Sequence, residues 1–294
     1  MGIKRSVGLI GYYLFANQLK DRFVAGATLQ DAVNKAKFFR DRGEKATINI
    51  LGEHVKNIHE ADMVREQIIE LMALLNKEGL TDVNVAEKPS QIGLDLSEYL
   101  YCRNKVKILE AARMYLPNGF VETDAEDHSY RESVFGVALE LSEWFTNQIL
   151  ACQINLHRTI WEVKKLQDAG VGLRICKGNA YKGDVEKEND LRKIYLDAAS
   201  TAISGGKKIS FATHDLFLID FIARKFAADR DKFEFNLLMG IEENLCRENC
   251  LRGFAFRRYI TCGINWRPYG KRRAEAVLGI WLRNFFYRTG RKQG

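Results

Sequence analysis

Short apolar runs alternate with longer amphipathic stretches along most of this 294-residue chain. The first helical signal starts at Thr28, which has an acidic residue, Asp31, three positions further on, and apolar positions at helical spacing continue until about Gly43. An apolar stretch at 46–53 then predicts a buried strand, and residues 59–76 again carry the helical spacing. A strand followed by a helix is therefore the repeating unit of the chain.

Further strands are predicted from the same pattern, each a short apolar run bounded by polar or glycine-containing turns. They cover residues 82–88, 120–127, 149–154, 171–178, 208–215, 233–240 and 257–261. About eight strand-helix units indicate a closed parallel barrel rather than an open doubly wound sheet. An open sheet usually carries a glycine-rich nucleotide-binding turn after its first strand, and neither that motif nor a Walker motif occurs. The predicted fold is an α/β, (βα)8 TIM-type barrel.

Composition agrees with a compact protein that has no linker. Of its residues, 46% are hydrophobic and only 3 are prolines, and no low-complexity stretch interrupts the chain. A length of 294 residues fits one large α/β barrel or two ordinary domains. We therefore expect a single domain, in which N-terminal helices over residues 1–45 pack on a catalytic (βα)8 barrel over residues 46–294.

The chain is basic, with a net charge of +7 and an isoelectric point near 9.0. Such a charge suits nucleic acid, an anionic membrane surface or an acidic substrate. The basic residues are scattered, however, and no basic stripe interleaved with aromatic residues is present, so no nucleic-acid partner is predicted. The 6 cysteines lack the spacing of a disulfide framework, which favours reduced thiols and an intracellular compartment.

Polar residues gather where the predicted strands end, and in barrels of this type the chemistry takes place at those carboxyl ends. The residues found there are Glu53, Lys88, Asp124, Glu126, Asp127, His128, Gln153, Arg174, Lys177, Tyr181, Thr213, His214, Asp215, Asn236 and Tyr259. Any one of them could be a helix cap or half of a salt bridge. So many polar residues at one end of the barrel predict a bound ligand or ion.

The last predicted strand is followed by a helix start at Pro268, whose fixed φ suits a first helical turn. Positions three and four residues apart share a helix face, so Tyr269, Arg272 and Arg273 point the same way. Two adjacent guanidinium groups repel each other unless an anion lies between them, and each can hold a carboxylate or a phosphate by two hydrogen bonds. This helix start is either a solvated basic turn or an anion site, and the neighbouring strand end favours the anion site.

A metal site is the alternative at this mouth. Asp124, Glu126 and His128 alternate, so an extended strand would place all three on one face, as a metal-dependent lyase or hydrolase requires. Fixed cations such as Lys88 and Arg174 oppose a metal ion and favour an anionic ligand. We therefore predict an anionic ligand and no metal.

A series of short motifs follows the strand ends in order. They are ILGE, VNVAEKPSQIGLDLSE, TDAED, the lone Gln153, LRICKGNAY, ATHD, FEFNLLMG and the stretch from tyrosine 259 to glutamate 275. Together, over residues 46–275, this ordered set resembles the proline dehydrogenase family. The resemblance implies a barrel with FAD at its mouth that oxidises L-proline to pyrroline-5-carboxylate by hydride transfer, the first step of proline catabolism. It also implies a membrane quinone as electron acceptor and pyrroline-5-carboxylate dehydrogenase as the downstream enzyme.

The resemblance assigns roles to individual residues. It implies that the proline carboxylate is held by Arg272 and Arg273. The residues implied to enclose the substrate ring and complete its polar wall are Tyr259, Tyr269, Tyr181, Leu238, Lys88 and Asp124. The implied FAD contacts are Gln153, Arg174, Lys177, Ala180, Thr213 and His214, with Arg174 near the reactive nitrogen of the flavin.

The chain departs from the family pattern around the substrate ring. Asn179 is inserted in the KGNAY motif, the spacing before Glu275 is one residue short, and Thr261-Cys262 and Asn236 replace the usual residues. The carboxylate clamp itself is unchanged. The expected substrate is therefore L-proline or a close cyclic imino acid, and a barrel that binds a carboxylate ligand without catalysis is a further hypothesis.

The C-terminal stretch 277–292 is apolar on one side and basic around it. As the last barrel helix it would pack against the strands, which we favour over contact with a membrane surface. Reduction of a quinone nevertheless requires an approach to the membrane. The expected location is the cytoplasm, peripheral on the inner face of the plasma membrane, or the mitochondrion if the source is eukaryotic.

Overall fold

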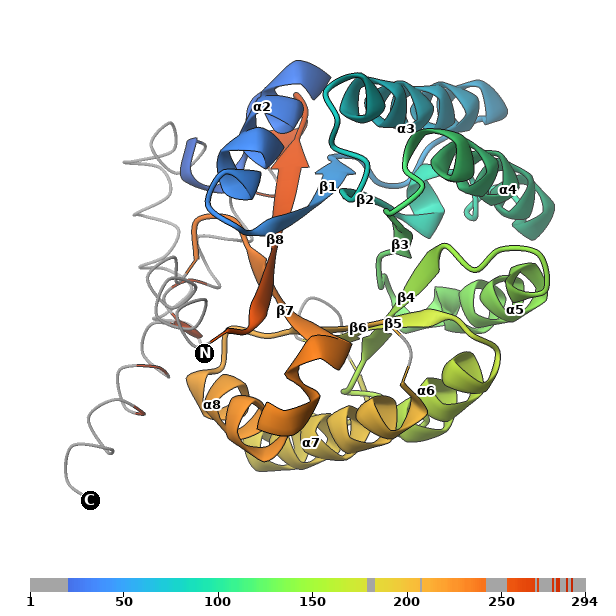
Figure 1. Cartoon of the computed structure of the whole chain (residues 1–294). Coiled ribbons are helices and arrows are strands. Elements are labelled where there is room, and N and C mark those ends of the chain that lie inside the picture. The colour runs from blue at the N-terminus through green and yellow to red at the C-terminus, as the bar shows by residue number, and fades with distance from the viewer. Residues whose placement is uncertain are drawn as a thin grey trace.

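The computed structural model describes residues 21–178, 183–206, 208–241 and 253–267, and residues 269, 277, 279, 280, 284 and 287 beyond them. This part of the chain forms a closed barrel of parallel strands, in which each strand pairs with the next and the last pairs with the first (Figure 1). The helices surround the ring of strands. The predicted (βα)8 TIM-type barrel is confirmed.

Every strand predicted from the apolar runs is present. The strands are β1 (Lys45–Ile50), β2 (Asn84–Glu87), β3 (Val121–Thr123), β4 (Gln148–Gln153), β5 (Gly172–Cys176), β6 (Ile209–Ala212), β7 (Phe233–Leu238) and β8 (Ala255–Cys262). The largest difference concerns β3, which was predicted over 120–127 but ends at Thr123. The acidic residues that follow Thr123 are therefore in a loop at the mouth of the barrel.

The helices between the strands are α3 (Ile58–Lys77), α4 (Glu98–Tyr115), α5 (Arg131–Ser142), α6 (Thr159–Asp168), α7 (Glu188–Gly205) and α8 (Leu216–Lys225), with short 3-10 turns η1 (Pro89–Gln91), η2 (His128–Tyr130) and η3 (Ala227–Lys232). Before β1, helix α2 (Leu29–Arg40) starts at a capping box, in which Thr28 and Asp31 bond each other's backbone N–H groups. It packs against β1 and β8 (Figure 1). A division between residues 45 and 46 stays a prediction.

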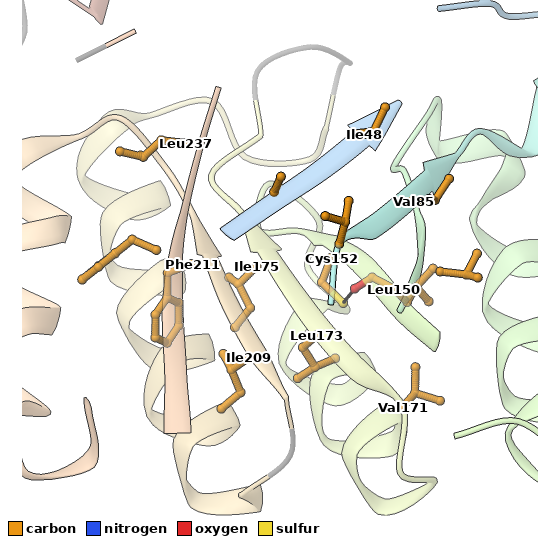
Figure 2. Close-up of a cluster of buried hydrophobic side chains, with 14 of the residues drawn as sticks. Ile48, Val85, Leu150, Cys152, Val171, Leu173, Ile175, Ile209, Phe211 and Leu237 are labelled. Carbon is orange, nitrogen blue, oxygen red and sulfur yellow. Dashed lines mark hydrogen bonds between the residues drawn. The ribbon is translucent and has the colours of Figure 1, made fainter. Parts of the chain in front are cut away.

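The apolar core lies between the strands and the helices. Alternate residues of each strand point outwards into this layer, and Figure 2 shows several of them on neighbouring strands, among them Ile48, Val85, Leu173 and Ile209. All four have no exposed surface.

In the described part of the chain, no helix combines the length and apolar character needed to cross a membrane.

The inside of the barrel is polar, whereas TIM barrels usually fill it with branched apolar residues. The Glu122 carboxylate on β3 accepts hydrogen bonds from Thr47 Oγ1 on β1 at 2.7 Å and from Asn84 Nδ2 on β2 at 2.6 Å. It also accepts one from Arg174 Nη1 on β5 at 2.7 Å. Because β3 is not a neighbour of β1 or β5, two of these bonds cross the interior. The interior is thus held together by hydrogen bonds and charge rather than by apolar packing.

Candidate active site

The loops after β1, β2, β3 and β4 are tied together at the mouth. Lys88, just after β2, forms an ion pair with Glu53 from the loop after β1. The backbone N–H and the hydroxyl of Ser90 both donate to the Glu126 carboxylate, at 2.7 and 2.6 Å. Gln153, at the end of β4, donates from Nε2 to the backbone oxygen of Glu126 at 2.9 Å. These contacts hold the predicted mouth residues Lys88 and Gln153 in fixed positions.

Arg174, in the middle of β5, links the barrel interior to the mouth. Its guanidinium bonds two carboxylates of the β3 region, Glu122 at 2.7 Å and Asp124 through its other terminal nitrogen. Asp124 also accepts a hydrogen bond from the hydroxyl of Tyr259 on β8. The Arg174 guanidinium carbon lies 5.1 Å from the centre of the Tyr259 ring, a cation-π contact. Residues from β3, β5 and β8 therefore form one network, which we call the mouth network: Glu122, Asp124, Arg174 and Tyr259.

The surroundings of Arg174 and Tyr259 shift the pKa values of these two side chains. Burial alone opposes the charge of Arg174, but the neighbouring carboxylates, Asp124 foremost, raise the pKa of its guanidinium well above its ordinary value. Burial, and then the Asp124 charge, raises the pKa of Tyr259 well above its ordinary value. Arg174 therefore stays a cation, and Tyr259 stays a hydrogen-bond donor.

Two buried donors inside the barrel have no hydrogen-bond partner among the described residues. They are Nε of Arg174 and Nδ2 of Asn236, whose residues are 5% and 4% exposed. An unpaired buried donor is costly, on the order of 1–3 kcal/mol, unless a ligand or water satisfies it. The mouth can therefore offer hydrogen bonds to a bound molecule that carries acceptor atoms.

The predicted cation and hydroxyl that follow β5 and β6, Lys177 and Thr213, are also held in place. Lys177, after β5, donates to Asp215 Oδ2 at 2.6 Å, and Arg192 donates to the same oxygen at 2.9 Å. The backbone N–H of Asp215 donates to Thr213 Oγ1 at 3.1 Å. His214 Nε2 accepts from the backbone N–H of Leu238 at 3.1 Å, so a neutral His214 ring carries its proton on Nδ1.

The structure brings many of the predicted site residues together. Tyr269 is 7% exposed and packs in a small apolar cluster with Phe23 and Ile241, against which Leu238 also packs. Leu238 thus joins Tyr269 to His214, while Asp124, Arg174 and Tyr259 share the mouth network. The predicted residues that lie outside the described part of the chain are Tyr181, Ala180, Arg272 and Arg273.

The alternative metal face, on which Asp124, Glu126 and His128 would lie together, does not form. Because β3 ends at Thr123, Asp124, Glu126 and His128 do not follow one another along an extended strand. Asp124 bonds the mouth network, Glu126 bonds Ser90, and the His128 side chain is 66% exposed beside Asp127. Among the described residues, no group of three or more His, Cys, Asp or Glu side chains is placed to hold a metal ion.

Glu122 is the one member of the mouth network that the sequence analysis missed. It is fully buried and joins β1, β2, β3 and β5 through its hydrogen bonds. Its only signal in the sequence is its place two residues before Asp124, inside an apolar run. Alternation puts residues two apart on the same face, so Glu122 belongs with Asp124 in the interior.

Known proteins with similar sequences are named proline dehydrogenases. Proline dehydrogenase 1 of Bacillus subtilis subsp. natto is 31% identical over 261 residues, which cover 86% of this chain and 84% of that protein. Proline dehydrogenase of Deinococcus radiodurans is 26% identical over 274 residues, covering 87% and 85% of the two chains. No protein-family model matches the chain.

A solved structure with the same fold is that of proline utilization A (PutA) from Bdellovibrio bacteriovorus, inactivated by N-propargylglycine. It superposes with a TM-score of 0.82 at 19% sequence identity, over 98% of this chain. The match covers 36% of the PutA chain, so this chain corresponds to about a third of that larger protein. At this identity the likeness concerns the fold alone.

Proposed function

Because this chain belongs to the proline dehydrogenase family, we propose that it oxidises L-proline to pyrroline-5-carboxylate, or a close cyclic imino acid to the corresponding cyclic imine. The observation that carries the proposal is the mouth network, in which Arg174, Asp124 and Tyr259 hold one another in place. Polar groups that are positioned before a ligand arrives stabilise developing charge without a further cost of reorganisation.

FAD is the proposed oxidant, and when bound it supplies the acceptor for the hydride that leaves the ring carbon next to nitrogen. The residues that would hold it are Gln153, Arg174, Lys177, Ala180, Thr213 and His214, of which Ala180 lies outside the described residues. The hydrogen-bond donors at the mouth fit a flavin. Nε of Arg174 is buried without a partner among the described residues, and the carbonyl and nitrogen atoms of a flavin ring are acceptors.

The work of the protein is to bind the substrate and fix its orientation. We propose that Arg272 and Arg273, which the sequence places on one helix face, grip the carboxylate through their guanidinium forks. Contacts to both the carboxylate and the ring fix the orientation of the bound substrate, so the reacting carbon is already in position when the reaction starts. Leu238, Tyr269 and Tyr259 would form part of the ring pocket, with Tyr181 beside them. The described members of this set are buried or half-buried.

The charge of the mouth network suits the other end of the substrate. Glu122 and Asp124 are two carboxylates against the single guanidinium of Arg174, which leaves a surplus of one negative charge. Lys88 does not change this balance, because Glu53 pairs with it. The ring nitrogen of an amino acid such as proline is positive until it loses its proton. A negative surplus near the ring therefore favours binding of the protonated amino acid.

Membership of the family also motivates the proposed partners. A membrane quinone would receive the electrons, and pyrroline-5-carboxylate dehydrogenase would consume the product. These partners agree with a cytoplasmic protein at the inner face of the plasma membrane, or with a mitochondrial one. Flotation of the purified protein with vesicles that contain anionic lipid and quinone tests this part of the proposal. Protein that stays at the bottom of the gradient and does not reduce the quinone would contradict it.

The flavin spectrum tests the proposed reaction. The purified protein should be yellow, and anaerobic L-proline should bleach its visible flavin band. Parallel additions of hydroxyproline and pipecolate rank the preferred ring. A protein that remains colourless when FAD is supplied would contradict the proposal. Binding of proline without bleaching would instead select a barrel that has lost catalysis.

A further inference from the structure

A cavity of about 240 Å³ lies at the amino-terminal ends of four neighbouring strands, opposite the mouth. Its walls come from the starts of β1, β6, β7 and β8 and from the turn η3. At roughly 30 Å³ for each water in the liquid, this volume corresponds to about eight water molecules. The charged side chains along it are Lys45, Lys208, Arg230, Asp231, Lys232 and Glu234. We call this space the basal cavity.

One buried carboxylate forms the inner wall of the basal cavity. Glu234 is 1% exposed and accepts hydrogen bonds from Arg257 Nε at 2.5 Å and from Ser210 Oγ at 2.7 Å. Two ammonium groups reach it from the cavity side, Lys208 at 3.4 Å and Lys45 at 3.5 Å. A single negative charge is therefore shared by three positive ones.

The energetics of the Glu234 cluster reflect this surplus. Burial alone would raise the pKa of Glu234, yet Arg257 and then Lys208 lower it to about 2. The pKa of Lys208 is lowered, first by burial and also by its neighbours Arg257 and Lys45, with Glu234 acting in the opposite direction. Three cations contact one carboxylate here, so a further anion within reach of Lys45 and Lys208 would be stabilised.

A further guanidinium faces the cavity from the turn η3. Arg230 is exposed, and in the described part of the chain it has no ion pair, hydrogen bond or ring contact. The backbone of Gly253 lies beside it, since a Cβ added to that glycine would stand 3.5 Å from Arg230 Nη1. Lys232 is less available, because it pairs with Asp229 at 2.7 Å. The Arg230 fork can therefore turn to a ligand without breaking a described contact.

We propose that the basal cavity binds a small multivalent anion of the phosphate class, held between Arg230 on one side and Lys45 and Lys208 on the other. A guanidinium fork matches two oxygens of a phosphate, and lysine ammonium groups add point charges with several donors each. The cavity has room for a phosphate together with part of an attached group or with water. This site is separate from the mouth and does not depend on the proposed oxidation.

Calorimetric titration of the full-length holoprotein with inorganic phosphate tests the proposal. Sodium chloride holds the ionic strength constant, so that general screening does not mimic binding. Phosphate should bind at one site per chain. Arg230→Gln should weaken that binding about tenfold, as expected for loss of a charged hydrogen bond. Arg230 is exposed, so this change should leave the melting temperature without phosphate unaltered.

A matched variant distinguishes phosphate binding in the basal cavity from non-specific attraction to the basic surface of the protein. Arg224→Gln makes the same chemical change at an exposed position that does not line the cavity. It should bind phosphate as the wild type does, while Lys208→Gln should show weakened binding like Arg230→Gln. Equal affinities in the wild type and in all three variants, or no heat above the chloride control, would overturn the proposal.

Two further titrations identify the source of the phosphate group. Pyrophosphate and ADP present the same chemistry with an added phosphate or an added nucleoside. Tighter binding of ADP than of pyrophosphate would indicate a nucleotide, and the reverse order would indicate a free inorganic anion. In both cases the Arg230→Gln variant should bind about tenfold more weakly than the wild type. An affinity that is unchanged in Arg230→Gln would place the binding elsewhere, and the proposed basal site would be wrong.

Discussion

The two ends of the barrel interior carry opposite surpluses of charge. At the mouth, one guanidinium, that of Arg174, is shared by the carboxylates of Glu122 and Asp124. At the base, one carboxylate, that of Glu234, is shared by three cations, including Arg257. Most members of both clusters project inwards from strands whose outward faces are mostly apolar. The apolar layer between strands and helices therefore stabilises the fold, and the barrel interior can hold charged side chains.

This difference suggests what each end can bind. A surplus of negative charge at the mouth suits the positive nitrogen of an amino acid, while a surplus of positive charge at the base suits an oxyanion. The two clusters also influence each other. Burial alone would lower the pKa of Arg257, but Glu234 first, and Glu122 further along the interior, raise it above its ordinary value. A change in one cluster is therefore expected to have a measurable effect on the other.

Removing Arg174 should have the largest effect. Arg174→Met leaves Glu122 and Asp124 buried without their shared cation, so the free energy of unfolding should fall by about 3–5 kcal/mol. The variant should also lose flavin reduction by proline. Urea unfolding and anaerobic bleaching measure the two effects. Arg224→Met, the same change at an exposed position, should alter neither. A wild-type rate and stability in Arg174→Met would show that the mouth network does not matter.

Acid unfolding should reveal the charge at the base. The pKa of Glu234 is about 2 in the folded chain against an ordinary value of 4.5, so its ionised form contributes about 3 kcal/mol of stability. That contribution is complete above pH 4.5 and is lost as the pH falls towards 2. The wild type should lose stability across this window, and Glu234→Gln should lack that part of the loss. Parallel curves for the two proteins would contradict the basal cluster as described.

The proposed carboxylate clamp should act on substrate affinity. Arg272→Met and Arg273→Met, made singly, should each raise the KM for proline roughly tenfold to a hundredfold, since each removes charged hydrogen bonds to the carboxylate. The flavin content should stay at the wild-type level, which separates loss of substrate binding from loss of the cofactor. Steady-state kinetics with Arg224→Met as the matched control provides the comparison. Unchanged KM values in both variants would show that Arg272 and Arg273 do not bind the substrate carboxylate.

The smallest expected effect concerns Glu126 at the mouth, whose pH dependence should have the opposite sign to that of Glu234. Burial raises the pKa of Glu126 above its ordinary value of 4.5. Its contribution to stability is therefore present below pH 4.5 and is lost as the pH rises through the raised pKa. Glu126→Gln should remove this dependence and change stability near pH 7 by no more than about 1 kcal/mol, since the amide oxygen still accepts from Ser90. A wild-type pH profile in Glu126→Gln would contradict the assignment.

The sequence predicted the barrel well because the signals were local. Apolar runs bounded by turns marked every strand, and the Thr28–Asp31 pair marked the start of α2. The end of β3 was wrong because the residues that decide it are distant. Asp124 is drawn into contacts with Arg174 on β5 and Tyr259 on β8, which no local pattern contains. Strand length there is set by tertiary contacts.

The site was predicted less completely than the fold. Glu122 was overlooked because an acidic residue within an apolar strand has no distinctive spacing, and its three partners lie on three other strands. The basal cluster was overlooked because barrel chemistry is expected at the carboxyl ends of the strands, whereas Lys45 and Lys208 stand at or before strand starts. The roles of Arg272 and Arg273 stay predictions, since both lie outside the described residues.

The central claim is that the mouth of this barrel oxidises a cyclic imino acid. The most direct measurement is the visible flavin absorbance of the purified holoprotein before and after anaerobic addition of L-proline, beside the Arg174→Met variant. The account predicts bleaching in the wild type and none in the variant. A wild-type flavin band that no cyclic imino acid bleaches, or bleaching that is equally fast in Arg174→Met, would contradict it.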